Sequence, residues 1–390
     1  MSKTTSTQTS VQNEVFSAAL SLVSRVPSTS MHPITNYVVV KARGKTMLQV
    51  AKTSLDITVI KTVPANNEGE GALAIDAKRL GSFAASLGKG NVGIRLTAST
   101  MTLWNAQASA EFKGISDTEF PTLDVAKGNP VIKLAPMHLK AAIQQVSFAA
   151  ATGDNRPMLM AVYWQIKEEL ILAAADGLRL SEAKALLTEV SGEPRNVLVP
   201  IAAMRILEAA LDGNAEVVEV ALCESKIVVT SGNTVIHAQL LQEKFVDYQR
   251  LIPKVVCQAQ MPHEGLVRAL KSITIFNEGV DVKLDTERTE IAAVGAEIGA
   301  GMGVVAMEAF KGESQTFRAQ ARLLLQALES LQSSSIILGS AGPGKAILMK
   351  PKGENGGVTS LHVVMPYNAP EPPKADEAAP AAVEATTAVG

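Results

Sequence analysis

The sequence contains few of the residues that usually signal chemistry. Its 390 residues include two cysteines and five histidines, and aromatic residues make up only 4%. Cys223 and Cys257 have neither the density of a disulfide-stabilised secreted scaffold nor the spacing of metal ligands, so we expect both to be reduced, as in a cytosolic protein. The histidines are scattered singly, which favours surface or strand positions over metal ligands or catalytic bases. They are His32, His138, His237, His263 and His362.

The chain also lacks a marked charge excess and a long apolar run. Its formal net charge is −2, so the total charge gives no indication of nucleic-acid binding. Without an uncharged apolar stretch of about 18 residues, no transmembrane helix is expected. The Ser/Thr-rich residues 1–10 have no apolar core, so we expect a disordered segment rather than a signal peptide. These observations predict a cytoplasmic protein.

Two glycine-rich stretches imitate nucleotide-binding motifs. Gly339–Lys345 matches a phosphate-binding loop except at its last position, where Ala346 replaces Ser or Thr and a strand follows instead of a helix. A β-turn between two strands is therefore expected. Gly299–Gly303 lacks the final glycine of a dinucleotide fingerprint and leads into an apolar strand, which favours a loop between strands. The sequence contains no catalytic triad or zinc-protease motif.

A long-period repeat is the clearest positive signal. An amphipathic helix pattern at 11–24 recurs at 136–149 and 264–276, and a second at 76–87 recurs at 200–211 and 319–331. The first helices start 125 and 128 residues apart, which is the size of a small domain and too long for a solenoid repeat. Three similar domains in a row are therefore expected.

Alternating strand patterns separate the helices in every third of the chain. Each third is expected to contain two helices and about six to eight antiparallel strands, an α+β unit. The predicted limits are 1–10 disordered, 11–128 domain 1, 129–256 domain 2, 257–368 domain 3 and 369–390 a disordered Ala/Pro/Glu-rich tail. The tail has too little apolar surface to offset the entropy lost on ordering.

Five short strings, read together with the repeat, resemble a known family. They are Phe120–Asp124 (FPTLD), Arg156–Leu159 (RPML), Ala175–Leu180 (ADGLRL), Phe245–Pro253 (FVDYQRLIP) and Val363–Tyr367 (VVMPY). In this order and at these separations they are similar to the bacterial beta sliding clamp, the processivity subunit of the replicative polymerase. The resemblance covers 11–367 and implies an α+β fold of three tandem DNA-clamp domains, half of a six-domain ring.

The resemblance implies a protein that is not an enzyme and needs no cofactor. Its partners would be a second copy of the chain, encircled double-stranded DNA, the replicative DNA polymerase, the clamp loader, and other repair and replication proteins with clamp motifs. Helices would line the hole and make sequence-independent phosphate contacts, which places the protein at the nucleoid.

The expected DNA-facing residues are cations on or beside the six helices. They are Arg25, Lys78, Arg79, Lys140, Arg205, Arg268, Lys271 and Arg322. The alternative for each is an ordinary solvated helix face. The chain departs from the family at Pro200–Ala203, where basic residues often follow the proline.

The resemblance also implies a pocket between the second and third domains for short linear motifs. Its residues would be Leu159, Gly177, Leu178, Arg179, Leu180, Val246, Arg250, Leu251, Val363, Val364, Met365, Pro366 and Tyr367. A Leu/Val/Met floor suits leucine or phenylalanine anchors, while Arg179 and Arg250 would contact the peptide at the rim. The alternative for the apolar members is ordinary strand core. Leu178, Val246 and Tyr367 depart from the usual family pattern, which predicts a more apolar pocket.

Two other functions compete with a sliding clamp. One is a clamp-fold interaction scaffold with weakened DNA function, suggested by the missing basic residues at Pro200–Ala203. The other is a nucleotide-dependent enzyme that uses Gly339–Lys345. Dimerisation with retention on circular DNA would separate the first from a clamp, and ATP binding that depends on Lys345 would support the second.

Overall fold

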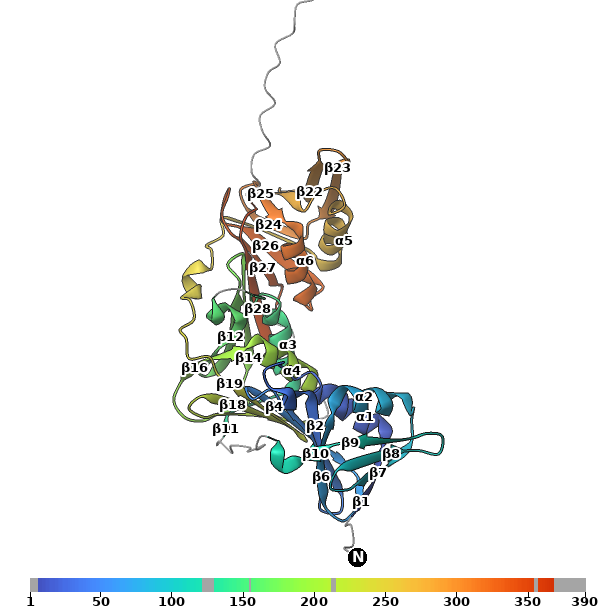
Figure 1. The fold of residues 1–390 in the computed structure, drawn as a ribbon. Coiled ribbons are helices and arrows are strands. Elements are labelled where there is room, and N and C mark those ends of the chain that lie inside the picture. Colours follow the sequence, from blue (N-terminus) through green and yellow to red (C-terminus); the bar gives the residue numbers. More distant parts are fainter. Residues whose placement is uncertain (1–5, 121–129, 154–155, 212–214, 354–356, 368–390) are drawn as a thin grey trace, which may run out of the picture.

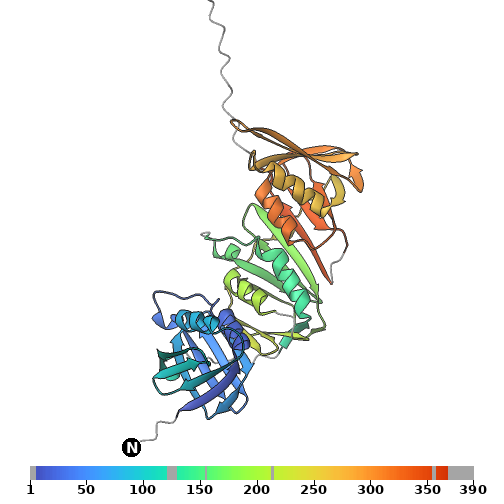
Figure 2. The ribbon, with the colours of Figure 1, turned by 90° about the vertical axis from the view of Figure 1, so that its right-hand side faces the viewer.

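The computed structural model describes residues 6–120, 130–153, 156–211, 215–353 and 357–367. The expected tail at 369–390 and residues 1–5 lie outside this part of the chain. Figure 1 shows three α+β units along a crescent, with helices toward the concave side and sheets toward the convex side. Figure 2, turned by 90°, shows the three units following one another from the N-terminal to the C-terminal unit.

The six expected helices are all present. They are α1 (Asn13–Val23), α2 (Ala77–Ser86), α3 (Pro136–Ser147), α4 (Ile201–Ala210), α5 (His263–Ile273) and α6 (Ala321–Ser330). Each is amphipathic, and residues spaced three or four apart, such as Phe16, Leu20 and Val23 of α1, are buried. Asp76 caps α2 because its side chain accepts a hydrogen bond from the backbone N–H of Arg79.

Every unit consists of two halves, and each half is a strand, a helix and three further strands. The first unit contains β1 (Thr7–Gln12), β2 (Tyr37–Arg43), β3 (Met47–Thr53), β4 (Ile57–Pro64), β6 (Gly71–Asp76), β7 (Asn91–Leu96), β8 (Thr100–Trp104) and β9 (Ser109–Lys113). The second contains β11 (Pro130–Leu134), β12 (Ala161–Ile166), β13 (Glu169–Ala175), β14 (Arg179–Leu186), β16 (Arg195–Pro200), β17 (Val218–Leu222), β18 (Lys226–Ser231) and β19 (Thr234–Gln239). The third contains β20 (Cys257–Pro262), β21 (Gly279–Leu284), β22 (Arg288–Gly295), β23 (Gly299–Ala306), β25 (Gln315–Gln320), β26 (Ser335–Ser340), β27 (Ile347–Pro351) and β28 (Val358–Val364). Short strands β5 (Asn66–Glu68), β10 (Ile115–Ser116), β15 (Glu189–Val190) and β24 (Ala309–Gly312) extend sheet edges.

The strand that precedes each helix ties the two halves of a unit together. In the first unit β1 pairs with β7 and β6 pairs with β2, and the same exchange recurs as β11–β17 with β16–β12 and as β20–β26 with β25–β21. All these pairs are antiparallel. The sequence patterns located the helices and the later strands of each half, but they missed these leading strands.

The N-terminal expectation is wrong for its last residues. Residues 1–10 were expected to be disordered and the first helix to begin at Val11, yet Thr7–Gln12 is strand β1, and α1 begins at Asn13. The side chains of Thr7, Thr9 and Val11 are buried, and the Thr7 hydroxyl donates to the carbonyl of Glu70 at 2.6 Å. Threonine is β-branched and suits a strand, so polar composition alone misidentified this segment.

The units join through continuous sheets. β4 of the first unit pairs with β19 of the second, which makes a ten-stranded sheet, and β14 of the second pairs with β28 of the third, which makes a nine-stranded sheet. In both cases the last strand of a first half pairs with the last strand of the next unit's second half. The remaining sheets end at β9 in the first unit and at β23 in the third.

Three further features bear on the expected classes of protein. Gly339 and Ser340 end strand β26 and only the residues from Ala341 on form the predicted turn before β27, whereas Gly299–Gly303 is part of strand β23 and not a loop. Within the described ranges, no helix is long and apolar enough to cross a membrane. In that same part of the chain, no group of three or more His, Cys, Asp or Glu residues is placed to hold a metal ion.

Candidate functional site

The residues expected to bind a partner peptide gather where β14 meets β28. Leu159, Leu180 and Val363 are each 3% exposed and belong to one apolar cluster with Phe245 and Tyr248. Leu159 lies in a 3₁₀ turn (Pro157–Met160), and Leu180 and Val363 are opposite each other in the β14–β28 pair. These side chains form a closed apolar floor at the junction of the second and third units.

Larger apolar side chains from three segments stay exposed around this floor. Leu178, Val246, Leu251 and Met365 are between 39% and 56% exposed. The backbone N–H of Met365 donates to the carbonyl of Leu178 at 2.8 Å, which holds two of the segments side by side. Exposed apolar side chains grouped over an apolar floor are typical of a surface that binds a partner.

A tight turn presents Leu178. Asp176 accepts hydrogen bonds from the backbone N–H groups of Leu178 (2.9 Å) and Arg179 (3.0 Å), and its own N–H donates to the carbonyl of Arg179. Gly177 has φ of +95°, a left-handed conformation that glycine adopts without a Cβ penalty. The turn therefore fixes the direction in which the exposed Leu178 side chain leaves the sheet.

A buried hydrogen bond anchors the segment that carries Val246 and Leu251. The Tyr248 hydroxyl donates to Oε2 of Glu182 at 2.7 Å, and both side chains are buried. Burial, together with this hydrogen bond, raises the pKa of Tyr248 well above its ordinary value. The Tyr163 and Phe245 rings stack at 5.2 Å with an interplanar angle of 6°, and Tyr248 meets Tyr163 edge-on.

A cavity of about 680 Å³ borders this segment. Its lining includes Tyr163, Phe245, Val246 and Tyr248. Of the expected pocket residues only Val246 lines it, so this cavity borders the candidate pocket without being the same hollow.

Several expected pocket residues have other environments. Val364 is fully buried in the core of the third unit, because side chains alternate along β28 and only Val363 faces the pocket. Tyr367 lies against Gly279, and its N–H donates to the carbonyl of Arg318 at 2.9 Å, so it packs on the third unit. Pro366 between them is half-buried.

The two arginines expected at the rim differ from each other. The Arg250 side chain is 85% exposed and forms an ion pair with Asp247 at 2.7 Å. The Arg179 side chain is only 11% exposed, and Nε contacts Asp176 at 2.9 Å. Arg179 is therefore a largely covered part of the junction, whereas Arg250 is exposed at the surface.

Several residues that support the pocket from the core beneath it were not predicted from the sequence. Phe245 and Tyr248 lie within the string Phe245–Pro253, but their side chains are buried and pack in the core instead of forming the exposed surface. Tyr163 and Glu182 have no local sequence signal, because the contacts that give them a role come from segments more than 60 residues away. Apart from local motifs, the scarcity of tyrosine, with four in the chain, is the signal that could have indicated Tyr163 and Tyr248.

The eight expected DNA-facing cations lie on the helices or directly after α1. Seven are exposed and Lys140 is half-buried. Together the six helices and Arg25 carry eight cationic side chains and four carboxylates, while the whole chain has a net charge of −2. Among the described residues, Lys271 alone of the eight has a carboxylate partner, Glu329 at 2.8 Å. The concave side is thus more positive than the molecule as a whole.

The histidines and the glycine-rich turn bear little resemblance to catalytic groups. His362 is buried between Ser181 and Ser330, and burial lowers its pKa to about 3. Burial also lowers the pKa of His237. The Gly339–Lys345 turn leads into strand β27 and not into a helix whose N-terminus could bind phosphate.

Comparison with known proteins gives a consistent picture. Residues 133–247 match the family model for the central domain of the DNA polymerase III beta subunit. The chain is 25% identical over 323 residues to the beta sliding clamp of Staphylococcus aureus (strain Mu50 / ATCC 700699), covering 80% of this chain and 85% of that protein. It is 24% identical over 311 residues to the beta sliding clamp of Bacillus subtilis (strain 168), covering 77% and 81%.

Solved structures share the whole architecture. The crystal structure of the DNA polymerase sliding clamp from Bacillus subtilis superposes with a TM-score of 0.85 at 20% identity, covering 94% of this chain and 100% of the other. The DNA polymerase III beta subunit from Thermotoga maritima gives a TM-score of 0.85 at 17% identity, covering 93% and 100%. At these identities the likeness establishes the fold, three tandem clamp domains.

Proposed function

Since this chain belongs to the family of bacterial DNA polymerase III beta sliding clamps, we propose that it is a DNA sliding clamp, which encircles duplex DNA and tethers the replicative polymerase. Relatives that match over about four fifths of the chain carry that name. A ring of this kind acts by topology, so sequence-independent contacts are sufficient. The alternative of a clamp-fold scaffold with weakened DNA function is not favoured.

The observation that carries the proposal is the pair of open sheet edges. Inside the chain, the last strand of a unit's first half pairs with the last strand of the next unit's second half. By this rule β23 requires the β9 strand of a following unit, and β9 requires the β23 strand of a preceding one. Within the described residues, β9 pairs only with β8 and β23 only with β22. A second copy supplies both partners, and two chains close a ring of six units.

The first junction provides the register for the seam; at the second junction the first residue of β14, Arg179, is opposite Val364, the last residue of β28, and the exposure of the seam residues decides between the two. In the first junction the first residue of β4, Ile57, is opposite Ala238, the last but one residue of β19. Applied to the seam, Gly299 of β23 would be opposite Phe112 of the second copy and Ala300 opposite its Glu111. This register is consistent with exposure, since Ala300 and Glu111 are both exposed, as opposite residues on one face of a sheet should be. Unpaired strand edges are strong templates for such pairing.

We propose that the cationic helix residues face the DNA. The helices that carry or precede these cations lie toward the concave side of the crescent, which would become the inner wall of the ring (Figure 1); the cations are Arg25, Lys78, Arg79, Lys140, Arg205, Arg268, Lys271 and Arg322. Their excess over carboxylates is modest. Modest charge favours sliding, because each phosphate contact is weak and is exchanged readily.

We propose that the pocket at the β14–β28 junction binds short linear motifs of the polymerase, the clamp loader, and repair and replication proteins. The exposed Leu178, Val246, Leu251 and Met365 would contact apolar anchors, above a floor of Leu159, Leu180 and Val363. Arg250 would contact the peptide backbone or a carboxylate. Methionine adapts to anchors of different shape, which suits several partners.

The proposed protein works without catalysis or a cofactor and acts in the cytoplasm at the nucleoid. Its proposed domain limits are 11–128, 129–256 and 257–368, with strand β1 added to the first domain. The connecting strands β11 and β20, each of which pairs within its own unit, support these divisions.

Solution mass and retention on DNA test the proposal together. Light scattering at micromolar concentration should give about twice 41.0 kDa. After loading, the protein should stay on nicked circular duplex DNA and be lost when the DNA is linearised, because a topological link does not survive a free end. A monomeric mass at every accessible concentration, or equal retention on linear DNA, would contradict a closed ring.

A further inference from the structure

The two junctions inside the chain have equivalent backbones. A three-residue turn precedes β4 at the first junction and β14 at the second, and its middle residue is left-handed in both (Leu55, φ +79°; Gly177, φ +95°). Ile57 and Arg179 are therefore equivalent as first residues of their strands. Ile206 and Gln326 are equivalent as sixth residues of α4 and α6.

The same positions have opposite chemistry at the two junctions. Val59 pairs with Ile236 at the first, where Ser181 pairs with His362 at the second. Four apolar positions of the first junction are thus polar or charged at the second. The equivalent pairs are Ile57 with Arg179, Val59 with Ser181, Ile206 with Gln326, and Ile236 with His362.

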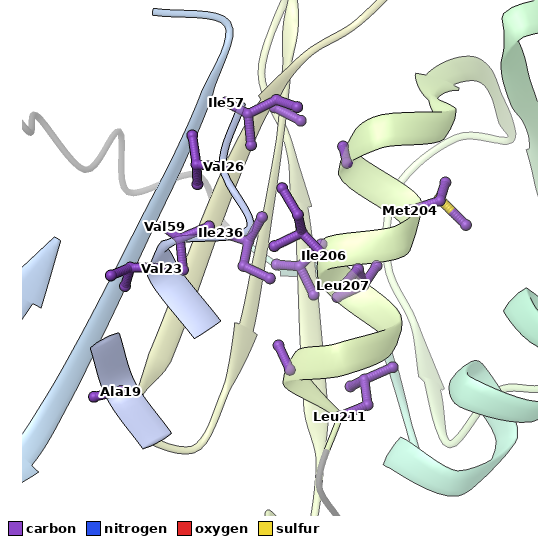
Figure 3. Close-up of a cluster of buried hydrophobic side chains, with 14 of the residues drawn as sticks. Ala19, Val23, Val26, Ile57, Val59, Met204, Ile206, Leu207, Leu211 and Ile236 are labelled. Atoms are coloured by element: carbon purple, nitrogen blue, oxygen red, sulfur yellow. The ribbon is translucent and has the colours of Figure 1, made fainter. Parts of the chain in front are cut away.

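The first junction is an ordinary apolar core. Figure 3 shows Ile206 of α4 pointing toward Ile236, with Val23, Val26 and Val59 close by. All five are buried and belong to one cluster that runs through both the first and the second unit. Apolar contacts are non-directional, so this junction fixes the two units together without depending on any single pair.

The second junction depends on directed polar contacts. The Arg179 guanidinium donates through Nε to Asp176 at 2.9 Å and through a terminal nitrogen to Oε1 of Gln326 on α6. It also lies over the Phe148 ring, 5.3 Å from the centroid, at the C-terminal end of α3. Arg179 thereby connects the turn that presents Leu178 with two helices, one from each unit.

A second set of contacts lies on the other side of Phe148. His362 contacts the Ser181 hydroxyl at 2.9 Å through Nδ1 and the Ser330 hydroxyl at 3.4 Å through Nε2, and its ring lies 5.5 Å from Phe148. Ser330 is the last residue of α6. On the helix-facing side of this junction the cores of the second and third units are thus separated by a polar layer, with Phe148 packed against both; apolar contacts between the units remain at Val358 and, on the opposite face, at Val363.

We propose that Arg179 and Gln326 are positioning residues for the candidate peptide pocket. They hold the 176–178 turn against α6. The direction of the Leu178 side chain therefore depends on the position of the third unit relative to the second at this junction. The proposal rests on the proposed function, since it assigns a role within the same pocket. The physical basis is that removal of Gln326 takes a hydrogen-bond acceptor from a nearly buried guanidinium. The turn at 176–178, which Arg179 attaches to α6, is then no longer fixed relative to that helix.

Gln326→Ala tests this, with Ile206→Ala as the matched control at the equivalent position of the first junction. The probe is a fluorescent peptide ending in Leu-Phe, and a peptide ending in Ala-Ala measures background. We expect Gln326→Ala to weaken binding about 3- to 10-fold, which is within the range for loss of an ordinary hydrogen bond, because the change reaches the peptide only through the turn. Gln326→Glu should retain affinity, because a carboxylate also accepts from Arg179. Ile206→Ala should lower thermal stability and leave peptide affinity unchanged.

Amide hydrogen exchange separates failure of this inference from failure of the pocket itself. In the free protein, Gln326→Ala should speed exchange at the N–H groups of Leu178 and Arg179, both of which donate to Asp176. If the wild-type protein binds no peptide, the pocket assignment fails, and exchange alone decides whether Gln326 holds the turn. Unchanged exchange and an affinity within twofold of wild type would overturn the inference. An equal loss of affinity in Ile206→Ala would also overturn it.

Discussion

The hydroxyl of Tyr248 donates a hydrogen bond of 2.7 Å to Oε2 of Glu182, although the two residues are 66 positions apart. Tyr248 lies in the 3₁₀ turn η4 (Tyr248–Leu251), whereas Glu182 lies in the middle of β14. The bond therefore attaches an irregular segment to the sheet that forms the pocket floor. The nearest cation to Glu182 is Lys184, with Nζ 4.0 Å from Oε1, so the tyrosine is its short-range partner.

Tyr248→Phe should destabilise the protein by about 1–3 kcal/mol, because the buried carboxylate of Glu182 loses its donor. Urea unfolding at neutral pH measures the effect. Tyr163→Phe is the matched control, since that hydroxyl only accepts a 3.5 Å contact from Gln165, and its loss should cost much less. Equal losses of unfolding free energy in the two variants would show that the Tyr248–Glu182 hydrogen bond stabilises the protein no more than the Tyr163–Gln165 contact does.

His362 should make stability fall in mild acid. Its pKa is lowered to about 3 by complete burial, so the folded protein binds fewer protons than the unfolded chain between about pH 6.5 and 3. The contribution is fully present above pH 6.5 and decreases as the pH falls, by about 2 kcal/mol at pH 5. Urea unfolding of the wild type and of His362→Gln at pH 7.5 and pH 5 isolates the contribution of His362 to stability. The variant should lose less stability on acidification, and identical losses would contradict the assignment.

Cysteines in the proposed seam register should cross-link two chains. With Glu111→Cys and Ala300→Cys in one chain, mild oxidation should give a covalent dimer, because opposite residues in an antiparallel pair have Cα atoms about 4.5–5.5 Å apart. Denaturing electrophoresis with and without reductant measures it. Glu111→Cys with Ala306→Cys is the out-of-register control and should not cross-link. Dimer formation by the control, and not by the first pair, would exclude this register.

Loss of an exposed apolar anchor should weaken peptide binding without unfolding the protein. Leu178→Ala removes a side chain that is 54% exposed, so stability should change by less than about 0.5 kcal/mol. The affinity for the Leu-Phe peptide should fall about tenfold, as for a residue at the centre of an interface. Fluorescence anisotropy measures the affinity. Val190→Ala, on the remote strand β15, is the control and should bind like wild type.

Removing three helix cations should reduce the salt dependence of DNA binding. Arg79→Ala, Arg205→Ala and Arg268→Ala combined should lower the slope of log affinity against log salt concentration by about one to three, with no change in sequence preference. Titration of duplex DNA at several NaCl concentrations measures the slope. The control is Lys283→Ala, an exposed cation of β21 paired with Asp285. A slope equal to wild type would exclude these residues from the DNA interface.

The sequence predicted the helices well because each has an apolar face that recurs every three to four residues. Each helix of the structure lies within three residues of its predicted limits; α3, expected at 136–149, is found at Pro136–Ser147, and α5, expected at 264–276, is found at His263–Ile273. The triplication followed from these same positions. The strands before the helices were missed, because segments such as Thr7–Gln12 bury threonine where a hydrophobic pattern was sought.

The pocket was only partly predictable for a different reason. Short strings located Leu159, Leu180 and Val363, which the structure brings into one cluster. The same strings could not separate Val363 from Val364, because adjacent residues of a strand face opposite sides and only the sheet pairing decides which side is the pocket.

By itself, the amino-acid sequence determined the number of units, their helices and the family to which they belong, since these depend on local periodicity and on short collinear strings. The tertiary structure alone decided that Arg179 packs, nearly buried, against Gln326 and Phe148 and is not exposed at the rim. In the part of the chain that the structure describes, it also left β9 of the first unit and β23 of the third as open edges. Burial and strand pairing arise from contacts between distant segments, and no local pattern encodes which distant segments will meet.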